Sequence, residues 1–278
     1  MKMIYTSDMG SVVMSGDGKE KFAVCEADGL ELMNRERNLV RFYNTHGYKE
    51  SNAFYGQRVI TVSGDIKTTD KDEMRRAIKV FSVQGTLKIE TDSQKREIAV
   101  DDVCFKLAED NGMYKKFCVQ MTCDSPFFTE CEDISAGAYV RENLITSETT
   151  LPAMFSKRTS GGNIINAGDI KCEPKIIIEC IDDTDEEGNI IVENSTIGCK
   201  IQINYTAKKG EIITVDIKER TITSSTKGDI TYALAPTSYL CDMYLKKGKN
   251  YVDAVADYGN RNCNVYVVFR NNYTGMVI

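Results

Sequence analysis

Few residues of this sequence could carry out catalysis. The sequence holds one histidine, His46, within the polar stretch Tyr43-Asn44-Thr45-His46-Gly47-Tyr48. Any Ser-His-Asp or Cys-His arrangement would have to use that residue, and no G-x-S-x-G nucleophile elbow is present. A carboxylate pair could hydrolyse a glycosidic bond, but no motif among the 41 acidic residues indicates one. We therefore predict no catalytic residue and a protein that is not an enzyme.

An acidic run, Asp182-Asp183-Thr184-Asp185-Glu186-Glu187-Gly188-Asn189, partly resembles a calcium loop. Counted from Asp183, the run places Asp185, Glu187 and Gly188 at positions 3, 5 and 6 of an EF-hand loop. Position 12, which requires a bidentate Glu, is Asn194. We expect a solvated hairpin loop between Ile181 and Ile190 and predict no metal ligand, although ion binding by this loop stays open.

Ten cysteines could suggest a disulfide framework, zinc binding or redox chemistry. No C-x-x-C pair occurs, which argues against zinc-ribbon and thioredoxin-like sites. The chain is long and begins without an apolar secretion segment, so a reducing compartment is expected. We predict that most of the cysteines are buried thiols that pack as small hydrophobic residues. Phosphate-binding glycine motifs are also missing, so no cofactor-binding residue is predicted.

Composition narrows the class of protein further. The 278 residues are 42% hydrophobic and 27% charged, with a net charge of -6. This composition is typical of a globular chain of nearly two domains. The acidity argues against a protein that grips nucleic acid, because such proteins usually present a basic face. No run of about 18 apolar residues exists, so we expect no membrane insertion.

Apolar residues alternate with a period of two over most of the first half of the chain. The alternation includes Ile60, Val62 and Ile66, then Leu87 and Ile89, Ile98 and Val100, Val103, Phe105 and Leu107, and Phe117, Val119 and Met121. Turn residues separate these short segments, which we interpret as strands. One segment, about 70–81, differs: Met74, Ala77, Ile78 and Phe81 follow helical spacing, and Asp70 with Glu73 resembles a capping box. We predict one short helix that plugs one end of a β-barrel or covers a sheet.

A second block of alternation begins near Pro174. The segment 175–181 is nearly continuously apolar, as in a strand buried on both faces or a core strand of a sandwich. Two further segments, 199–205 and 213–217, alternate around Lys208-Lys209-Gly210 and predict a meander. We expect a mainly β protein with two domains: 1–128, an N-terminal β-sandwich or barrel, and 129–278, a β-sandwich that includes a linker at about 129–172.

Several motifs then resemble the distal tail proteins of long-tailed bacteriophages. In the first half, Gly56-Gln57-Arg58-Val59 opens a strand that reaches Gly64-Asp65-Ile66, and the helix and Gly85-Thr86-Leu87-Lys88-Ile89 follow. The exit Cys123-Asp124-Ser125-Pro126-Phe127 resembles the polar-Pro-aromatic end of that domain. In the second half, the similar motifs are Lys209-Gly210-Glu211-Ile212 and Leu245-Lys246-Lys247-Gly248-Lys249-Asn250.

The resemblance implies a structural protein of the virion. Relatives form a hexameric ring at the tail tip, so a homo-hexamer is implied here, in contact with the tail tube protein and the tip hub. The N-terminal domain lines the ring, and a galectin-like C-terminal β-sandwich serves as a platform for host-adsorption proteins, in some relatives a receptor-binding protein. Such a ring is assembled in the bacterial host cytoplasm, from phage or prophage genes, and lets DNA pass without specific binding. The acidic net charge favours an inner wall that is not dominated by Lys and Arg.

Two other functions stay open. A carbohydrate-binding or glycan-active β-sandwich protein is the alternative from another class. The chain has no Trp to stack a sugar, and its only histidine, His46, lies in the other domain, so a galectin-type sugar site is disfavoured. A related baseplate component of a contractile phage or a bacteriocin-like particle is the other possibility. The sequence identifies neither the host nor the residues of a ring interface.

Overall fold

The computed structural model describes residues 1–44, 46–67, 70–110, 115–143, 156–160, 162–184, 189–255 and 263–276. Contacts divide the chain into two compact units, Met1–Cys131 with Asn272–Ile278, and Glu132–Asn271. The end of the chain therefore returns to the first unit, a feature that the expected division into 1–128 and 129–278 does not contain. That division stays a prediction about domains. The expected linker region holds several strands, which are given below.

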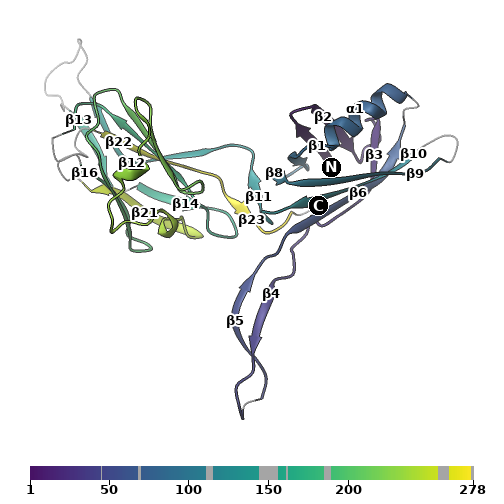
Figure 1. The fold of residues 1–278 in the computed structure, drawn as a ribbon, viewed down its shortest axis with the longest axis horizontal. Helices are drawn as coiled ribbons and strands as arrows, with labels where there is room; N and C mark the ends of the chain where they lie inside the picture. Colours follow the sequence, from purple (N-terminus) through teal and green to yellow (C-terminus); the bar gives the residue numbers. More distant parts are fainter. Residues whose placement is uncertain are drawn as a thin grey trace. The chain divides into compact units, whose positions relative to one another are not determined.

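The first unit is built on one ten-stranded sheet and a separate two-stranded hairpin (Figure 1). The order in the sheet is β23-β11-β8-β7-β1-β2-β3-β6-β10-β9. The strands are β1 (Lys2–Ser7), β2 (Gly10–Ser15), β3 (Phe22–Asp28), β6 (Arg58–Ile66), β7 (Gly85–Glu90), β8 (Lys95–Val100), β9 (Asp102–Asp110), β10 (Lys115–Cys123), β11 (Phe128–Glu130) and β23 (Asn272–Tyr273). The hairpin consists of β4 (Glu36–Val40) and β5 (Lys49–Phe54).

Alternation along the strands places one set of side chains in a common core. In the antiparallel pair β6–β10, Val62 lies opposite Val119 and Ile60 opposite Met121, and all four are fully buried. Strand β8 also contacts β10, which is not its neighbour in the sheet, so the sheet curves around this core. At Gly64 of β6, an added Cβ would lie 1.9 Å from the Ala23 carbonyl oxygen, so this strand needs glycine there.

The predicted helix is α1 (Lys71–Phe81), and it packs against β1, β2 and β9. Asp70 is its N-cap, and the Asp70 carboxylate accepts a hydrogen bond from the Asp72 backbone N–H at 2.9 Å. The carboxylate of Glu73, expected to complete a capping box, lies 2.5 Å from Lys21 Nζ. The helix therefore begins where the sequence predicts, and one of its acidic residues contacts the chain near β3.

The buried face of α1 differs from the predicted one at two positions, Ile78 and Val80. Met74, Ala77, Val80 and Phe81 are buried, whereas Ile78 is 43% exposed. The prediction for Ile78 was wrong because this side chain lies at the margin of the apolar face, on the side of β9, where it is only partly covered. Val80 occupies the core position instead, with no exposed area.

The second unit is a β-sandwich of two sheets. The seven-stranded sheet has the order β13-β12-β22-β15-β18-β19-β20, and the four-stranded sheet has the order β14-β21-β16-β17. The first sheet contains β12 (Ile134–Asn143), β13 (Ser156–Ser160), β15 (Lys175–Cys180), β18 (Ile212–Asp216), β19 (Thr221–Ser224), β20 (Gly228–Asp229) and β22 (Cys263–Phe269). The second contains β14 (Gly162–Asn166), β16 (Asn189–Asn194), β17 (Cys199–Asn204) and β21 (Gly248–Val255). Two short 3-10 helices, η1 (Thr231–Ala233) and η2 (Leu240–Asp242), complete the unit.

Two sequence-based pairings in this unit were wrong. The predicted meander would pair β17 with β18, but these strands belong to different sheets, and the chain crosses between the sheets through the Lys208–Gly210 turn. The acidic run likewise joins β15 of one sheet to β16 of the other and does not close a hairpin. Alternation predicts which face of a strand is apolar, but it carries no information on which strand is the neighbour. Within the acidic run, 185–188 lie outside the described residues.

The cysteines are less buried than expected. All ten lie in the described residues and none forms a disulfide; four are buried, three are intermediate and three, Cys25, Cys104 and Cys241, are exposed. Cys25 is the extra residue of a β-bulge in β3, between Val24 and Glu26, which turns it out of the alternation. The predicted mainly β class with one α-helix is confirmed over the described residues. None of the helices described there is long and apolar enough to span a membrane.

Candidate assembly surfaces and the Arg58 junction

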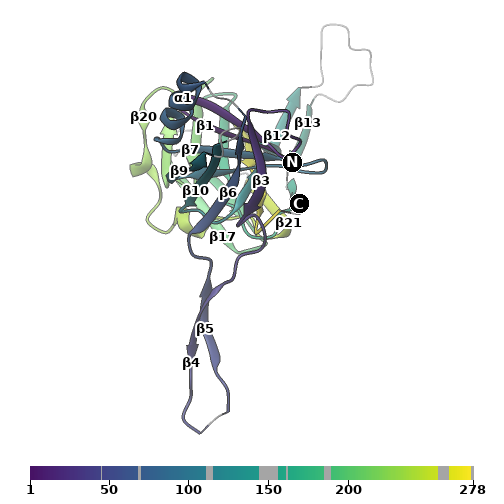
Figure 2. The same cartoon turned by 90° about the vertical axis from the view of Figure 1, so that its right-hand side faces the viewer.

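The hairpin of β4 and β5 projects from the first unit (Figure 2). All five residues of β4 are exposed, and all of β5 except Ala53. At the tip, Asn44 has φ 59° and Gly47 has φ 86°, both in the left-handed region that favours these residue types in tight turns. His46 lies in the tip and is exposed. The loop position predicted for His46 is therefore the end of a hairpin.

The hairpin presents apolar side chains to solvent. The exposed fractions are 47% for Leu39, 45% for Val40, 52% for Phe42, 93% for Tyr43 and 66% for Tyr48. Lys49 Nζ lies 5.9 Å from the centroid of the Phe42 ring, and an ion pair of 3.5 Å joins Arg35 to Glu50, which lies opposite Leu39 in the hairpin. An isolated two-stranded hairpin is marginally stable in water. A cluster of exposed apolar residues on such an element is typical of an interaction surface.

A buried arginine fixes the base of the hairpin. Arg58, the first residue of β6, is 1% exposed. Its Nη1 donates to the carbonyl oxygens of Gly29 at 2.5 Å and Glu31 at 2.9 Å, which precede the hairpin. Its Nε donates to Pro126 O at 2.7 Å, and its Nη2 donates to Thr274 O at 2.6 Å.

The same guanidinium thus ties together three parts of the first unit. They are the chain before the hairpin, the exit from β10, and the returning C-terminal segment. The guanidinium also lies over the Phe128 ring, with Cζ 4.6 Å from the centroid. Burial lowers the pKa of Arg58. The four carbonyl oxygens accept the hydrogen bonds that the guanidinium would make to water if it were exposed. We name this arrangement the Arg58 junction.

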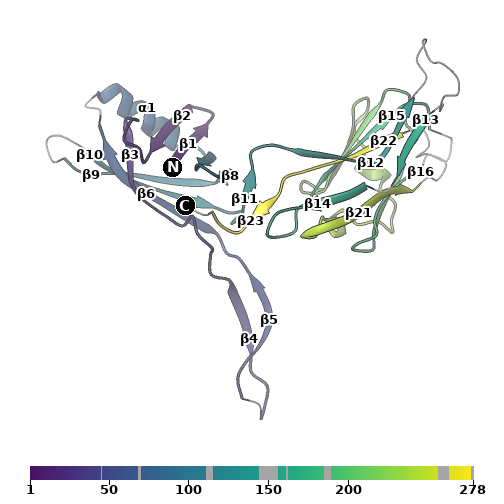
Figure 3. The same ribbon diagram turned by 180° about the vertical axis from the view of Figure 1, so that it is seen from behind.

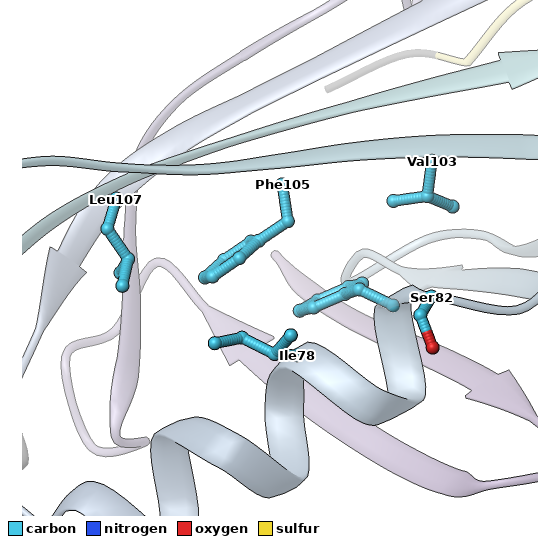
Figure 4. A pocket seen from close by; sticks show the side chains of 6 residues that line it. Ile78, Ser82, Val103, Phe105 and Leu107 are labelled. Carbon is cyan, nitrogen blue, oxygen red and sulfur yellow. The ribbon is translucent and has the colours of Figure 1, made fainter.

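An apolar groove lies between α1 and the edge strand β9. Val103, Phe105 and Leu107 extend from β9 toward Ile78 and Ser82 at the end of the helix (Figure 4). The Phe105 ring stacks on Phe81 with centroids 5.3 Å apart. Leu107 is 46% exposed, so the predicted apolar face of this strand is only partly covered. The strand lies at one end of the ten-stranded sheet, where backbone groups are open to another chain.

In the second unit, a buried carboxylate holds the crossing between the sheets. Glu211 is 3% exposed, and its Oε1 accepts hydrogen bonds from Tyr205 OH at 2.7 Å, from Thr226 Oγ1 at 2.6 Å and from the Ser224 hydroxyl. Its Oε2 accepts from the Lys208 backbone N–H at 2.9 Å. Burial alone raises the pKa of Glu211, but these four hydrogen bonds outweigh it and lower the pKa to about 2.

The described residues of the acidic run, 182–184 and 189, form no cluster of ion ligands. Asp183 Oδ1 accepts from the Lys209 backbone N–H at 2.8 Å, and Asp182 pairs with Lys209 Nζ at 3.5 Å. Asp185, Glu187 and Gly188 of the calcium alignment lie outside the described residues. Among the residues that the structure describes, no group of three or more His, Cys, Asp or Glu side chains could hold a metal ion.

Sequence reasoning missed the hairpin and the Arg58 junction. The segment 36–54 mixes charged, polar and aromatic residues without clear alternation, so it gave no strand signal. The paired aromatic and charged residues around Asn44 and Gly47 are the features that could have indicated a hairpin. Arg58 carries no local signal of burial, because its acceptors come from parts of the chain up to 216 positions away.

Comparisons with known proteins find similarity to tail proteins of phages, both in sequence and in structure. The segment 167–273 matches the family model described as siphovirus-type tail component, C-terminal domain. The whole chain is similar to the crystal structure of SPP1 Dit (gp 19.1) protein, which is described as a paradigm of the hub adsorption apparatus in phages that infect Gram-positive bacteria. The TM-score is 0.68 at 15% identity, covering 98% of this chain and 99% of the other.

Two baseplate structures are also similar. A chain of the phage P2 baseplate in its activated conformation with Ca gives a TM-score of 0.53 at 10% identity, covering 97% of each chain. The phage p2 baseplate with Sr gives 0.50 at 9% identity, covering 96% of this chain and 97% of the other. No curated protein sequence matches the chain. The predicted resemblance is confirmed: residues 167–273 match the siphovirus-type tail component model, and the chain as a whole is similar in fold to SPP1 Dit.

Proposed function

We propose that this protein is a structural component of the tail tip of a phage or phage-like particle. It acts as the distal tail hub, a ring that joins the tail tube to the tip and carries host-adsorption proteins. The observation that carries this proposal is the similarity to SPP1 Dit over 98% of this chain and 99% of the other, which covers both units. The family match of 167–273 supports it independently from sequence.

The ring is a homo-hexamer in this proposal, and its first unit provides the contacts between neighbours. A closed ring needs heterologous contacts, in which two different surfaces of one chain meet those of the next copies. The hairpin with Leu39, Phe42 and Tyr43 exposed and the open edge at β9 are two such surfaces. The proposed partners are the tail tube protein on one side of the ring, the tip hub on the other, and a receptor-binding protein at the second unit.

The proposed role requires no catalysis. His46, the one histidine in the sequence, lies in the exposed hairpin tip, and the buried carboxylate of Glu211 is occupied by four hydrogen bonds. The net charge of -6 suits a ring through which DNA passes without being held. The carbohydrate-binding alternative gains no support from the comparisons, which lead to tail and baseplate proteins. The protein would be assembled in the host cytoplasm and act at the virion tail tip.

The proposal is tested on the purified full-length chain. Light scattering coupled to size-exclusion chromatography measures the mass, and negative-stain imaging gives the symmetry. We expect a mass of six chains and six-fold rings, formed by the protein alone or after mixing with the tail tube protein and tip hub. A species that stays monomeric at high concentration, both alone and with those partners, would overturn the proposal.

A further inference from the structure

Two buried thiols face each other in the core of the second unit. Cys180 is the last residue of β15 and Cys263 is the first residue of β22, two neighbouring antiparallel strands (Figure 3). The register places the two residues directly opposite each other. Their sulfur atoms are 3.4 Å apart, and the residues are 4% and 0% exposed. Neither residue stood out in the sequence, where 82 positions separate them.

The backbone shows what kind of cross-strand position this is. The Cys180 N–H donates to Glu211 O at 2.9 Å, and the Cys180 carbonyl accepts from the Gly210 N–H at 2.8 Å. Both groups therefore point toward the strand on the other side of β15, so Cys180 and Cys263 form a non-hydrogen-bonded pair. In such pairs the Cα atoms are about 4.5 Å apart. That separation lies within the range of about 4.4–6.8 Å that disulfides adopt.

The two thiols are chemically unequal. The Cys263 thiol donates a hydrogen bond to the Cys180 sulfur. This hydrogen bond lowers the pKa of Cys180, and the same contact together with burial raises the pKa of Cys263. The thiolate is the form that reacts with oxidants. Once either sulfur is oxidised, the other lies 3.4 Å away and is placed to resolve the product.

We propose that Cys180 and Cys263 are an oxidisable pair that forms a disulfide between β15 and β22 when the protein meets a small peroxide. One of the two sulfurs, as the thiolate, attacks one peroxide oxygen and breaks the O–O bond, which gives a sulfenic acid and hydroxide; the hydroxide takes up the proton that the thiol released. The other thiol then attacks the oxidised sulfur and gives up its proton, the S–O bond breaks, and water leaves. Overall, two thiols and one hydrogen peroxide give one disulfide and two waters.

Burial selects the oxidant, and the strand ends provide access. Both residues lie at a terminus of their strand, where local opening costs less than in the middle of a sheet. A small peroxide needs a smaller opening than a bulky disulfide reagent such as oxidised glutathione. The setting rests on the proposed function, because a particle assembled in a reducing cytoplasm meets oxidants after cell lysis. The pair chemistry itself does not depend on ring formation.

The disulfide would close a long loop of the second unit and so restrict its unfolded state. We therefore expect the oxidised protein to unfold at a temperature higher by roughly 5 °C or more. Reduction with a phosphine should reverse the increase. A thiol pair that is only a packing contact would show neither effect.

The test treats the folded protein with hydrogen peroxide, blocks remaining thiols with N-ethylmaleimide in denaturant, and maps tryptic peptides by mass spectrometry. The background carries Cys25→Ser, Cys104→Ser, Cys199→Ser and Cys241→Ser, which removes the exposed thiols and the second cysteine of the tryptic peptide 176–200. We expect a cross-link between that peptide and the peptide 262–270, with the loss of two hydrogen atoms.

Matched variants separate the pair from other buried thiols. Cys263→Ala should abolish both the cross-link and the increase in unfolding temperature, and Cys180→Ala serves if that variant does not fold. Cys172→Ala, which changes another buried cysteine of the same core, should retain both effects. Recovery of Cys180 and Cys263 as N-ethylmaleimide adducts after oxidation, or a cross-link to a different cysteine, would overturn the proposal. Both readouts come from folded protein of any oligomeric state, so failure here is distinct from failure to form rings.

Discussion

Arg58 in the first unit and Glu211 in the second are charged side chains that the fold buries and satisfies with hydrogen bonds. Arg58 donates to four backbone carbonyl oxygens, and Glu211 accepts four hydrogen bonds. A buried charge is tolerated when hydrogen bonds satisfy it, and its removal leaves several polar groups unpaired. Arg58 therefore joins segments up to 216 positions away in sequence, whereas Glu211 joins groups within 15 positions of itself.

For Arg58, we expect Arg58→Met to lower the free energy of unfolding of the first unit by about 3 kcal/mol or more, because four buried carbonyls lose their donor. Arg58→Lys should recover only part of that loss, since one ammonium group cannot reach all four acceptors. Urea unfolding measures the change. Arg37→Met, on the exposed strand β4, is the control and should change stability by less than about 0.5 kcal/mol. Equal effects of Arg58→Met and Arg37→Met would contradict the assignment.

For Glu211, the folded-state pKa of about 2 lies below the unfolded value of 4.5. The carboxylate therefore stabilises the fold fully above about pH 4.5, and this contribution is lost as the pH falls toward 2. The loss amounts to about 3 kcal/mol. Denaturant titrations at several pH values between 7 and 2 measure the free energy of unfolding of the wild type and of Glu211→Gln. Over this range, the free energy of unfolding should fall by about 3 kcal/mol less in the variant than in the wild type. Glu219→Gln, an exposed neighbour, should keep the wild-type profile.

At the scale of elements, the exposed hairpin and the groove beside β9 are apolar surfaces that the chain's own described residues leave partly uncovered. The hairpin contributes little to the core of its own unit, since nearly all of its residues are exposed. Its base, in contrast, is held by the Arg58 junction through Gly29 and Glu31. A rigid base with an exposed apolar end fits an element that packs on another chain.

We expect the triple variant Leu39→Ser, Phe42→Ser and Tyr43→Ser to fold as the wild type does, with its unfolding temperature within a few degrees. The same variant should lose ring formation in light scattering and imaging, because it removes apolar area from the proposed contact between neighbours. The matched control is Tyr232→Ser with Tyr239→Ser, which changes exposed aromatic residues of the second unit, 78% and 61% exposed. Rings that persist in the hairpin variant would contradict this role.

At the scale of the whole molecule, the chain forms two β units, and its end returns to the unit where it began. The short strand β23 pairs with β11, and Thr274 and Gly275 accept from Arg58 and Arg96 of the first unit. The sandwich, Glu132–Asn271, thus lies in sequence between two segments that both belong to the first unit. Two chain segments therefore connect the units, where a simple C-terminal domain would have one.

The sequence by itself determined the mainly β class, the inward faces of most strands, the position of α1 and the resemblance to phage tail proteins. These are local properties: an alternation such as Ile60, Val62 and Ile66 follows from strand geometry wherever the strand lies. Only the tertiary structure decided that β17 and β18 belong to different sheets, that Ile78 is only partly covered, that Arg58 is buried and that Cys180 meets Cys263. These outcomes depend on contacts between distant segments, and the periodicity of one segment contains no information about its partner.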